Sequence, residues 1–394
     1  MKKSPLVIIF VTVFIDLLGF GIVIPVLPFY AEKYGATGLT VGLLMSSYSF
    51  MQLIFSPIWG RISDLKGRRP IILMSLVGSS ISYLIFGLAD SLAVLFISRF
   101  FAGIFAANIS TSQAYISDST TAANRAKGMG LIGAAFGLGF VLGPLFGGYF
   151  SHFGYRIPAF LASAICGINF FFALFSLPET LKPEMIGEKR SLSLESIKKT
   201  FSFPLLGILV FLMFIITFSF STLEATFALF AEQKYHFSSV ETGYVFGFIG
   251  ILMAIMQGGL IGHLVKKFGE KRLVVAGTFM MILGLILIPF APNLYYLLVV
   301  LVVLSFGLGI NNPSITSLIS QHTDPHFVGA TMGVSQAMGS LARILGPMSG
   351  GFVYDRYGID TPYIFAGLTM GLAFIMAIVF LIKSQRSKAV VQPK

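Results

Sequence analysis

The stretch from Gly130 to Gly148 reads GLIGAAFGLGFVLGPLFGG, and it determines how the rest of the chain is interpreted. Glycines recur along it, among them Gly130, Gly139, Gly143, Gly147 and Gly148, and Pro144 directly follows Gly143. In a water-exposed helix, each interior glycine costs about 1 kcal/mol relative to alanine. In a membrane, small residues instead let neighbouring helices approach closely, because helix association there depends on packing. Because proline also removes a backbone hydrogen bond and kinks a helix, we expect a bent, tightly packed membrane helix.

The composition is that of a polytopic membrane protein. Hydrophobic residues make up 56% of the 394 residues and charged residues only 11%, whereas soluble domains carry about 25% charged residues. One membrane span needs about 20 apolar residues. With short loops the chain is long enough for twelve spans, so we predict an all-α membrane protein with twelve transmembrane helices.

The apolar segments and the polar breaks between them give the expected boundaries. We expect span one from about Leu6 to Tyr30, span two from Val41 to Ile62 and span four from Leu92 to Ile116. Span three is expected to end at Ala89 and span six at Leu177. Spans seven to twelve begin near Pro204, Ser238, Arg272, Leu294, Phe327 and Thr361. We expect residues 1–178 to form an N-terminal six-helix bundle, 179–203 a cytoplasmic linker with a short amphipathic helix, 204–383 a C-terminal six-helix bundle and 384–394 a cytoplasmic tail.

Two motifs of the first half recur in the second half. Gly60-x3-Asp64-x2-Gly67-Arg68-Arg69 has a partner in Gly262-x3-Lys266-x2-Gly269-Glu270-Lys271, and Gly143-Pro144-x2-Gly147-Gly148 recurs as Gly346-Pro347-x2-Gly350-Gly351. The two offsets are 202 and 203 residues, about half the chain. Parallel repeats related by an axis along the membrane normal are typical of transporters. We therefore expect two pseudo-symmetric bundles whose rocking opens a central cavity alternately to each side.

The net charge of +11 reflects membrane topology and not nucleic-acid binding. With the N-terminus inside, the expected cytoplasmic segments hold 21 of the 27 Lys and Arg residues. The external loops hold Lys33, Arg156, Lys234 and Arg356. This asymmetry follows the positive-inside rule, and it predicts a multi-pass protein of the cell membrane with both termini in the cytoplasm.

The spacing Gly-x8-Gly-x3-Gly-Pro-x2-Gly-Gly resembles the antiporter signature in the fifth helix of drug:proton exporters of the major facilitator superfamily. A generic glycine-rich packing helix is the alternative interpretation. The loop GRISDLKGRRP, residues 60–70, resembles the signature loop between spans two and three of the same superfamily. Both resemblances imply the twelve-helix fold of that superfamily.

We expect the loop from Gly60 to Pro70 to form a conformational latch. Its members would be Gly60, Asp64, Gly67, Arg68, Arg69 and, on a neighbouring inner loop, Asp118. A carboxylate such as Asp64 can accept from the N-terminal amides of a facing helix, and the two arginines can pair with Asp118. The alternative is that the arginines only set topology. The second copy carries Lys266 in place of the aspartate, so an asymmetric latch is expected.

Four ionisable side chains lie within predicted spans, at Asp16, Arg99, Glu224 and Arg343. Each costs about 2.5–3.5 kcal/mol at the centre of a membrane helix, so such residues are usually functional. Asp16 is expected near the membrane midplane as a proton carrier, with Arg99 as the partner that tunes it. Arg99, in LFISRFFAGIFAA, also resembles the span-four arginine motif of these exporters. A static ion pair between spans one and four is the alternative.

The second pair is less specific. Glu224 is expected to be a second proton site or a counter-ion for cationic substrates, or else to be neutralised against Arg343 or a backbone carbonyl. Arg343 can pair with Glu224 or attract an anionic substrate. The remaining polar residues within spans are candidates for the substrate cavity or for hydrogen bonds between helices. They are Gln52, Asn108, Gln113, Gln257, Asn311, Asn312 and Gln336.

The start LVIIFVTVFIDLLGFGIVIPVLP and the stretch VKKFGEKRLVVAG resemble the tetracycline-exporter branch of the drug:proton antiporters. That resemblance implies efflux of a small amphipathic compound in exchange for protons, with the span-one aspartate taking part. Exporters of tetracycline carry an aspartate in span nine and a histidine early in span eight, where this chain has Met281 and Met253. These departures put tetracycline in doubt as the substrate and leave multidrug efflux open.

We therefore predict a proton-coupled antiporter that exports small amphipathic compounds by alternating access. It would be a monomer in the lipid bilayer that uses the proton gradient as its energy source, without a metal, a cofactor or nucleic acid. No ATP-binding loop or catalytic constellation occurs in the sequence, so an enzyme is not expected. The alternatives are an exporter or flippase of an anionic sugar or lipid on the same fold, and a transport-inactive membrane scaffold or sensor.

Overall fold

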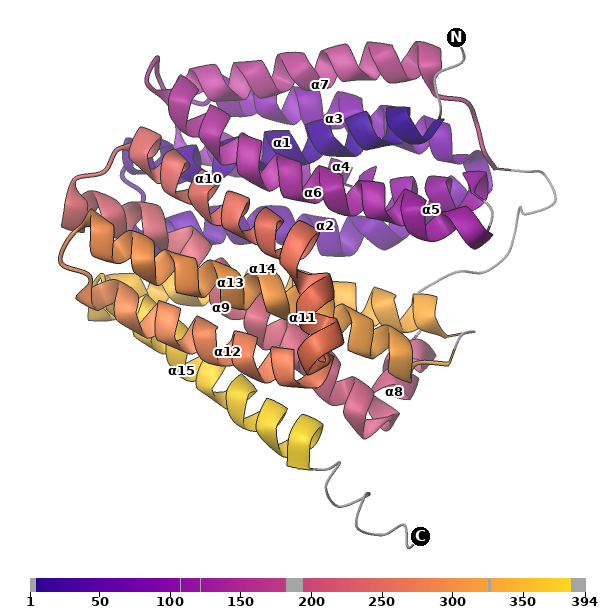
Figure 1. The fold of residues 1–394 in the computed structure, drawn as a ribbon. Helices are drawn as coiled ribbons and strands as arrows, with labels where there is room; N and C mark the ends of the chain where they lie inside the picture. The colour runs from indigo at the N-terminus through magenta and orange to yellow at the C-terminus, as the bar shows by residue number, and fades with distance from the viewer. Residues whose placement is uncertain (1–4, 107, 121, 182–193, 325–326, 384–394) are drawn as a thin grey trace, which may run out of the picture. The chain divides into compact units, whose positions relative to one another are not determined.

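The structure is a computed structural model that describes residues 5–106, 108–120, 122–181, 194–324 and 327–383. Within these ranges every regular element is a helix (Figure 1). A helix satisfies its backbone hydrogen bonds internally, so it is the element expected where lipid replaces water. Ten of the described helical segments are long and apolar enough to cross a membrane.

The helices of the first half begin close to the expected boundaries. They are α1 (Pro5–Glu32), α2 (Gly38–Lys66), α3 (Arg68–Gly87), α4 (Leu92–Phe105), α5 (Asn108–Ser119), α6 (Ala122–Ser151) and α7 (Arg156–Ser176). Together, α4 and α5 fill the segment predicted as the fourth span.

The second half follows the same plan. Its elements are α8 (Leu194–Ser202), α9 (Pro204–Tyr235), α10 (Ser239–Ile255), the π-helix η2 (Met256–Leu260), α11 (Ile261–Phe268), α12 (Glu270–Leu287), the 3-10 helix η3 (Ile288–Phe290), α13 (Leu294–His322), α14 (Val328–Tyr357), α15 (Thr361–Met376) and the π-helix η4 (Ala377–Lys383). Helix α8 lies in the predicted linker. When α4–α5, α10–α11, α12–η3 and α15–η4 each count as one crossing, the described elements form twelve crossings, which confirms the predicted fold class.

The chain forms two compact units. The first comprises residues 1–191 and 231–250, and the second comprises residues 192–230 and 251–394. Helix α9 therefore begins in the second unit and ends in the first. The expected bundle boundaries after residues 178, 203 and 383 remain predictions.

The apolar core of the first unit lies where α1, α3, α5 and α6 meet. Ile9, Leu76, Tyr115 and Ala135 are fully buried there. In the second unit α12 packs against α13 and α15 (Figure 1), and Met256, Leu273 and Ile310 form a smaller buried cluster.

The glycine-rich helix α6 packs directly against α1. A Cβ atom added at Gly139 would lie 2.6 Å from Leu17 Cβ, and one added at Gly143 would lie 2.6 Å from Gly21 Cα. At Gly147 it would overlap the carbonyl oxygen of Ile22. These three glycines therefore place the two backbones in contact, as the membrane packing argument requires.

The remaining glycines of the motif behave differently from one another. A Cβ atom on Gly148 would lie 2.9 Å from Gly243 Cα, so this residue brings α6 against α10 within the first unit. Gly130 is exposed and has nothing within 4 Å of the position of an added Cβ atom. The motif is therefore a packing surface along most of its length, and its first glycine has no packing role among the described residues.

Candidate functional site

Asp16 is buried in α1, with only 8% of its surface exposed. The hydroxyl of Ser79 on α3 donates a hydrogen bond to Asp16 Oδ1 at 3.2 Å. The carboxyl group therefore has one hydrogen-bond donor among the described residues in a buried position, which is an expensive place for a charge. A proton that enters or leaves this group changes the charge of the bundle interior by one unit.

Arg99 on α4 is 3% exposed, and its Nε and Nη2 atoms have no hydrogen-bond partner among the described residues. Its guanidinium carbon lies 4.9 Å from the ring centre of Phe86 and 6.0 Å from that of Tyr83. Cation–π contact of this kind stabilises a buried cation only in part. Donors left without an acceptor in the bundle remain available to a carboxylate or a ligand.

Asp16 and Arg99 form no ion pair with each other in the described part of the chain. Tyr83 of α3 lies within electrostatic range of both residues, and its ring packs on Gly19, one turn after Asp16. The static ion pair between spans one and four is therefore not formed among the described residues, and the role of Arg99 as the partner that tunes Asp16 remains a prediction. Sequence reasoning missed Ser79 and Tyr83, although both belong to the polar stretch GSSISY of the third span.

Glu224 occupies the corresponding interior of α9 in the second unit. It is 7% exposed, and its Oε1 atom has no hydrogen-bond partner among the described residues. Arg343 of α14 lies within electrostatic range of Glu224 and donates from Nη2 to Ser340 Oγ at 3.3 Å. The second unit therefore also holds a carboxyl group and an arginine in its apolar interior.

The loop between α2 and α3 forms an ionic network in the first unit. Arg68 contacts Asp64, four residues before it, and its Nε atom lies 2.9 Å from Asp118 Oδ2 on α5. Arg68 Nη1 also donates to Ser63 Oγ at 2.7 Å. The partner of Asp64 in this network is therefore the side chain of Arg68, whereas the sequence suggested the backbone amides of a facing helix. The role of this network as a latch remains a prediction.

Glu179, which sequence reasoning had placed only in the linker, covers the N-terminus of α3. Its Oε1 atom accepts the backbone N–H of Arg68 at 2.9 Å, and its Oε2 atom accepts that of Arg69 at 3.1 Å. Gly67 has a φ of +105°, and an added Cβ atom would collide with this carboxylate, so only glycine fits there. The position directly after the sixth span was the signal that could have identified Glu179.

Glu179 Oε1 also accepts the backbone N–H groups of Thr180 and Leu181. Partial burial favours the neutral acid, but the four N–H donors outweigh it and lower the pKa of Glu179 below its usual range. Arg69 donates from Nη2 to the carbonyl oxygen of Leu174 at 2.6 Å, so its partner at this atom is a backbone group and not the expected inner-loop carboxylate.

The second copy of the loop lacks this ionic network. Lys266 is exposed, and Glu270, the counterpart of Arg68, accepts from Ser317 Oγ at 3.2 Å and from Gln321 Nε2 at 2.8 Å on α13. The two loops thus join equivalent helices by different chemistry, with charge pairs in one unit and neutral donors in the other.

The polar residues proposed for a substrate cavity have different environments. Asn311 is fully buried between α12 and α13, where its Nδ2 atom donates to the sulfur of Met281 at 3.4 Å, so it makes a contact between helices. Gln52, Gln113 and Asn312 are half-buried, and Gln257 and Gln336 are exposed. The side chain of Asn108 lies outside the described residues.

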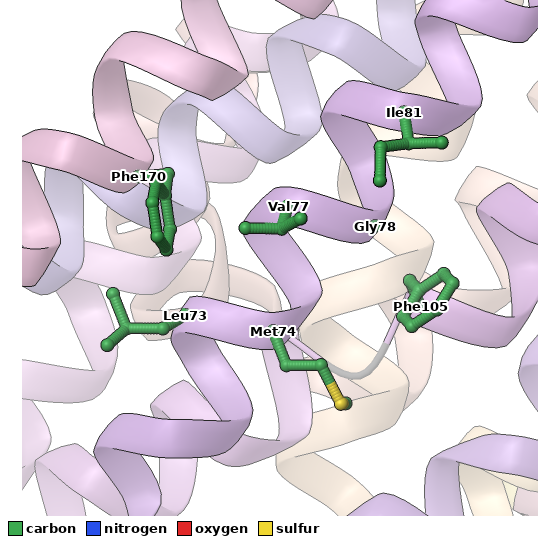
Figure 2. Close-up of a pocket in the computed structure, with 7 residues that line it drawn as sticks. All are labelled: Leu73, Met74, Val77, Gly78, Ile81, Phe105 and Phe170. Carbon is green, nitrogen blue, oxygen red and sulfur yellow. The ribbon is translucent and has the colours of Figure 1, made fainter.

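An apolar pocket of about 300 Å³ lies elsewhere in the first unit (Figure 2). It is lined by Leu73, Met74, Val77, Gly78, Ile81, Phe105 and Phe170. Figure 2 shows Phe105 and Phe170 flanking α3. The lining includes neither Asp16 nor Arg99, so the pocket is separate from the site around Asp16.

The described residues contain no group of three or more His, Cys, Asp and Glu side chains that could hold a metal ion. Twelve crossings with isolated charges in their interiors define a polytopic membrane transporter. A family model described as Major Facilitator Superfamily matches residues 9–266 and 258–394. The chain therefore belongs to the Major Facilitator Superfamily and is an integral transporter of the plasma membrane.

Two relatives share most of their length with this chain. It is 33% identical over 386 residues to multidrug resistance protein 2 of Bacillus subtilis, covering 95% of each chain. It is 31% identical over 356 residues to the class C tetracycline resistance protein of Escherichia coli, covering 88% of this chain and 89% of the relative.

Two solved structures share the fold. The human organic anion transporter MFSD10 is 26% identical, with a TM-score of 0.74 and coverage of 95% of this chain and 100% of the other. A mutant of the nucleoside transporter NupG gives a TM-score of 0.81 at 15% identity, with coverage of 96% and 100%.

Proposed function

We propose that this transporter is a proton-coupled antiporter that exports small amphipathic compounds by alternating access. The observation that carries the proposal is the buried carboxyl group of Asp16, which has a single serine hydroxyl as its hydrogen-bond donor. Arg99 supports it, because it is buried in α4 with two donor atoms that have no hydrogen-bond partner among the described residues. The names of the multidrug and tetracycline resistance relatives support the substrate class.

The mechanism follows from the cost of charge in an apolar interior. An ionised Asp16 is poorly solvated by Ser79 alone, so protonation removes that cost and favours a closed, dry environment. Hydration, or the approach of the Arg99 guanidinium, favours the ionised form again. Protons that bind on one side and leave on the other would then drive the exchange. Glu224 would supply an equivalent site in the second unit.

The test is transport by the purified protein in proteoliposomes with an imposed pH gradient. Suitable probes are ethidium as a lipophilic cation and tetracycline as a zwitterion. We expect gradient-driven accumulation by the native protein and its loss in Asp16→Asn. Exchange of labelled for unlabelled substrate without a gradient is the control for folding and binding, and Asp16→Asn should retain it.

The matched control is Asp90→Asn, which removes an exposed carboxylate whose neighbour is Ser91. It should leave gradient-driven transport unchanged. Persistence of gradient-driven accumulation in Asp16→Asn would refute the coupling role of Asp16, while retained exchange would keep the transporter assignment intact.

A second candidate is export of an anionic compound. The half-buried Arg343 and the structural likeness to an organic anion transporter favour it. The same assay with anionic substrates discriminates between the two. Selective loss of anion exchange in Arg343→Ala, with cation exchange unaffected, would favour this alternative.

A further inference from the structure

The side chains of two glutamates meet where α1 and α9 end. Glu32 is the last residue of α1, and Glu232 lies in the last turn of α9, whose end belongs to the first unit. Both are half-buried, and their carboxyl groups lie close enough together to interact directly. Neither residue belongs to the set of buried charges to which the proposed function assigns a role.

An ionised carboxylate is only an acceptor, so two of them cannot form a hydrogen bond without a proton. Two ionised carboxylates at this separation repel each other, and such pairs commonly hold one proton between them. Neither Glu32 nor Glu232 has an ion-pair partner in the described part of the chain. A nearby cation therefore does not relieve the repulsion through direct contact.

The surrounding groups have other partners or lie on the surface. The other titratable side chains at the corresponding helix ends of the first unit are Tyr30, Lys33 and Tyr34 near the end of α1, Asp90 after α3, His152 and Tyr155 between α6 and α7, Arg156 at the start of α7, Lys234 and His236 near the end of α9, and Glu241 on α10. Arg156 donates to Tyr30 Oη and to the carbonyl oxygen of Ala89. Glu241 accepts from Ser238.

Tyr155 lies within electrostatic range of both carboxyl groups. Its ring stacks on Phe29 at 6.5 Å and lies 6.0 Å from the ring of Tyr30, both on α1. Close contacts hold the adjoining end of α10 in place, because Ser151 and Ser239 hydroxyls are 2.7 Å apart. The two carboxyl groups therefore meet within a packed, partly desolvated end of the first unit.

We propose that Glu32 and Glu232 form a proton-binding site in which one shared proton holds the ends of α1 and α9 together. Loss of that proton leaves two facing negative charges and separates the helix ends. The ligand is a proton, and the site is distinct from Asp16 and Glu224. The inference therefore stands whether or not transport is driven by a proton gradient.

The experiment measures the distance between the two helix ends as a function of pH. In a Cys166→Ala background, Lys33→Cys and Gln233→Cys place spin labels at two exposed positions next to the glutamates. Double electron–electron resonance on the purified protein in lipid nanodiscs from pH 5 to pH 9 reports the separation. We expect a short distance at low pH and a longer one to replace it as the pH rises.

The decisive variants are Glu32→Gln and, separately, Glu232→Gln. An amide N–H can donate to the remaining carboxylate without a bound proton, so each variant should keep the short distance across the pH range. Asp90→Asn, at an exposed carboxylate near Ala89, is the matched control and should show the native pH profile. Asp16→Asn should also retain it, which separates this site from the proposed coupling residue.

A distance that does not change with pH in the labelled parent protein would overturn the proposal. The proposal would also be overturned if both glutamine variants kept the pH-dependent change in distance. The same holds if the change disappeared in Asp16→Asn while both glutamine variants kept it. Gel filtration of each variant verifies folding, and the two reciprocal substitutions keep the test valid if one of them does not fold.

Discussion

Glu179 illustrates how one residue controls the start of a helix in this protein. The backbone N–H groups at a helix N-terminus lack partners within the helix and favour a negative charge. Glu179 lies after the end of α7 and accepts the N–H groups of Arg68 and Arg69, so it connects the segment after α7 to the start of α3. It also leaves no room for a side chain at Gly67, so the loop motif and the linker depend on each other.

We predict that Glu179→Gln lowers stability by about 1 kcal/mol at neutral pH, because a neutral side chain binds helix N–H groups more weakly. Thermal unfolding can be followed by reaction of the buried Cys166 with a thiol-reactive dye. Asp90→Asn, which removes an exposed carboxylate after the other end of α3, is the control and should have little effect.

The difference between native protein and Glu179→Gln should depend on pH in one direction. The pKa of Glu179 is lower in the folded protein than its ordinary value of 4.5, so its contribution is complete above that value. It is lost as the pH falls through the folded-state pKa. A difference in melting temperature that grows on acidification would contradict this account.

At the scale of elements, the contact between α1 and α6 depends on where each glycine faces. Gly143 has the backbone of Gly21 against it, whereas Gly130 and Gly137 have nothing within 4 Å of an added Cβ atom. The glycines of the stretch from Gly130 to Gly148 therefore divide into those that allow helix contact and those, such as Gly130 and Gly137, that do not.

Gly143→Ala should destabilise the protein by about 1–3 kcal/mol, because overpacking forces the two backbones apart. Gly137→Ala should be neutral or stabilising by up to about 1 kcal/mol, because alanine favours the helix. The thiol-reactive unfolding assay compares both with the native protein. Equal loss of stability in the two variants would show that the packing explanation is wrong.

For the whole molecule, the distribution of positive charge predicts orientation. Lys267, after the eighth crossing, should face the cytoplasm, and Lys33, after the first, should face outward. In cells carrying a Cys166→Ala background, a membrane-impermeant thiol reagent should label Lys33→Cys and not Lys267→Cys. Both positions are exposed, so the opposite pattern would reverse the predicted topology.

The sequence by itself determined the number of crossings, the repeat of the two halves and the family. The physical reason is that a membrane helix must be long, apolar and internally hydrogen-bonded, and these properties are local. The positions of Asp16, Arg99, Glu224 and Arg343 within helices were predictable for the same reason. A charged residue inside a long apolar segment is recognised from the sequence alone, because the free-energy cost of placing it in the membrane depends on its position in that segment.

Only the tertiary structure decided which of these side chains meet. The side chains of Ser79 and Tyr83 on α3 reach α1 near Asp16, and the Arg99 guanidinium lies over aromatic rings. Glu32 and Glu232 lie 200 positions apart in the chain, but their carboxyl groups interact where two helices end. Such contacts depend on how helices rotate and cross, and a hydrophobic sequence that permits many packings does not specify this locally.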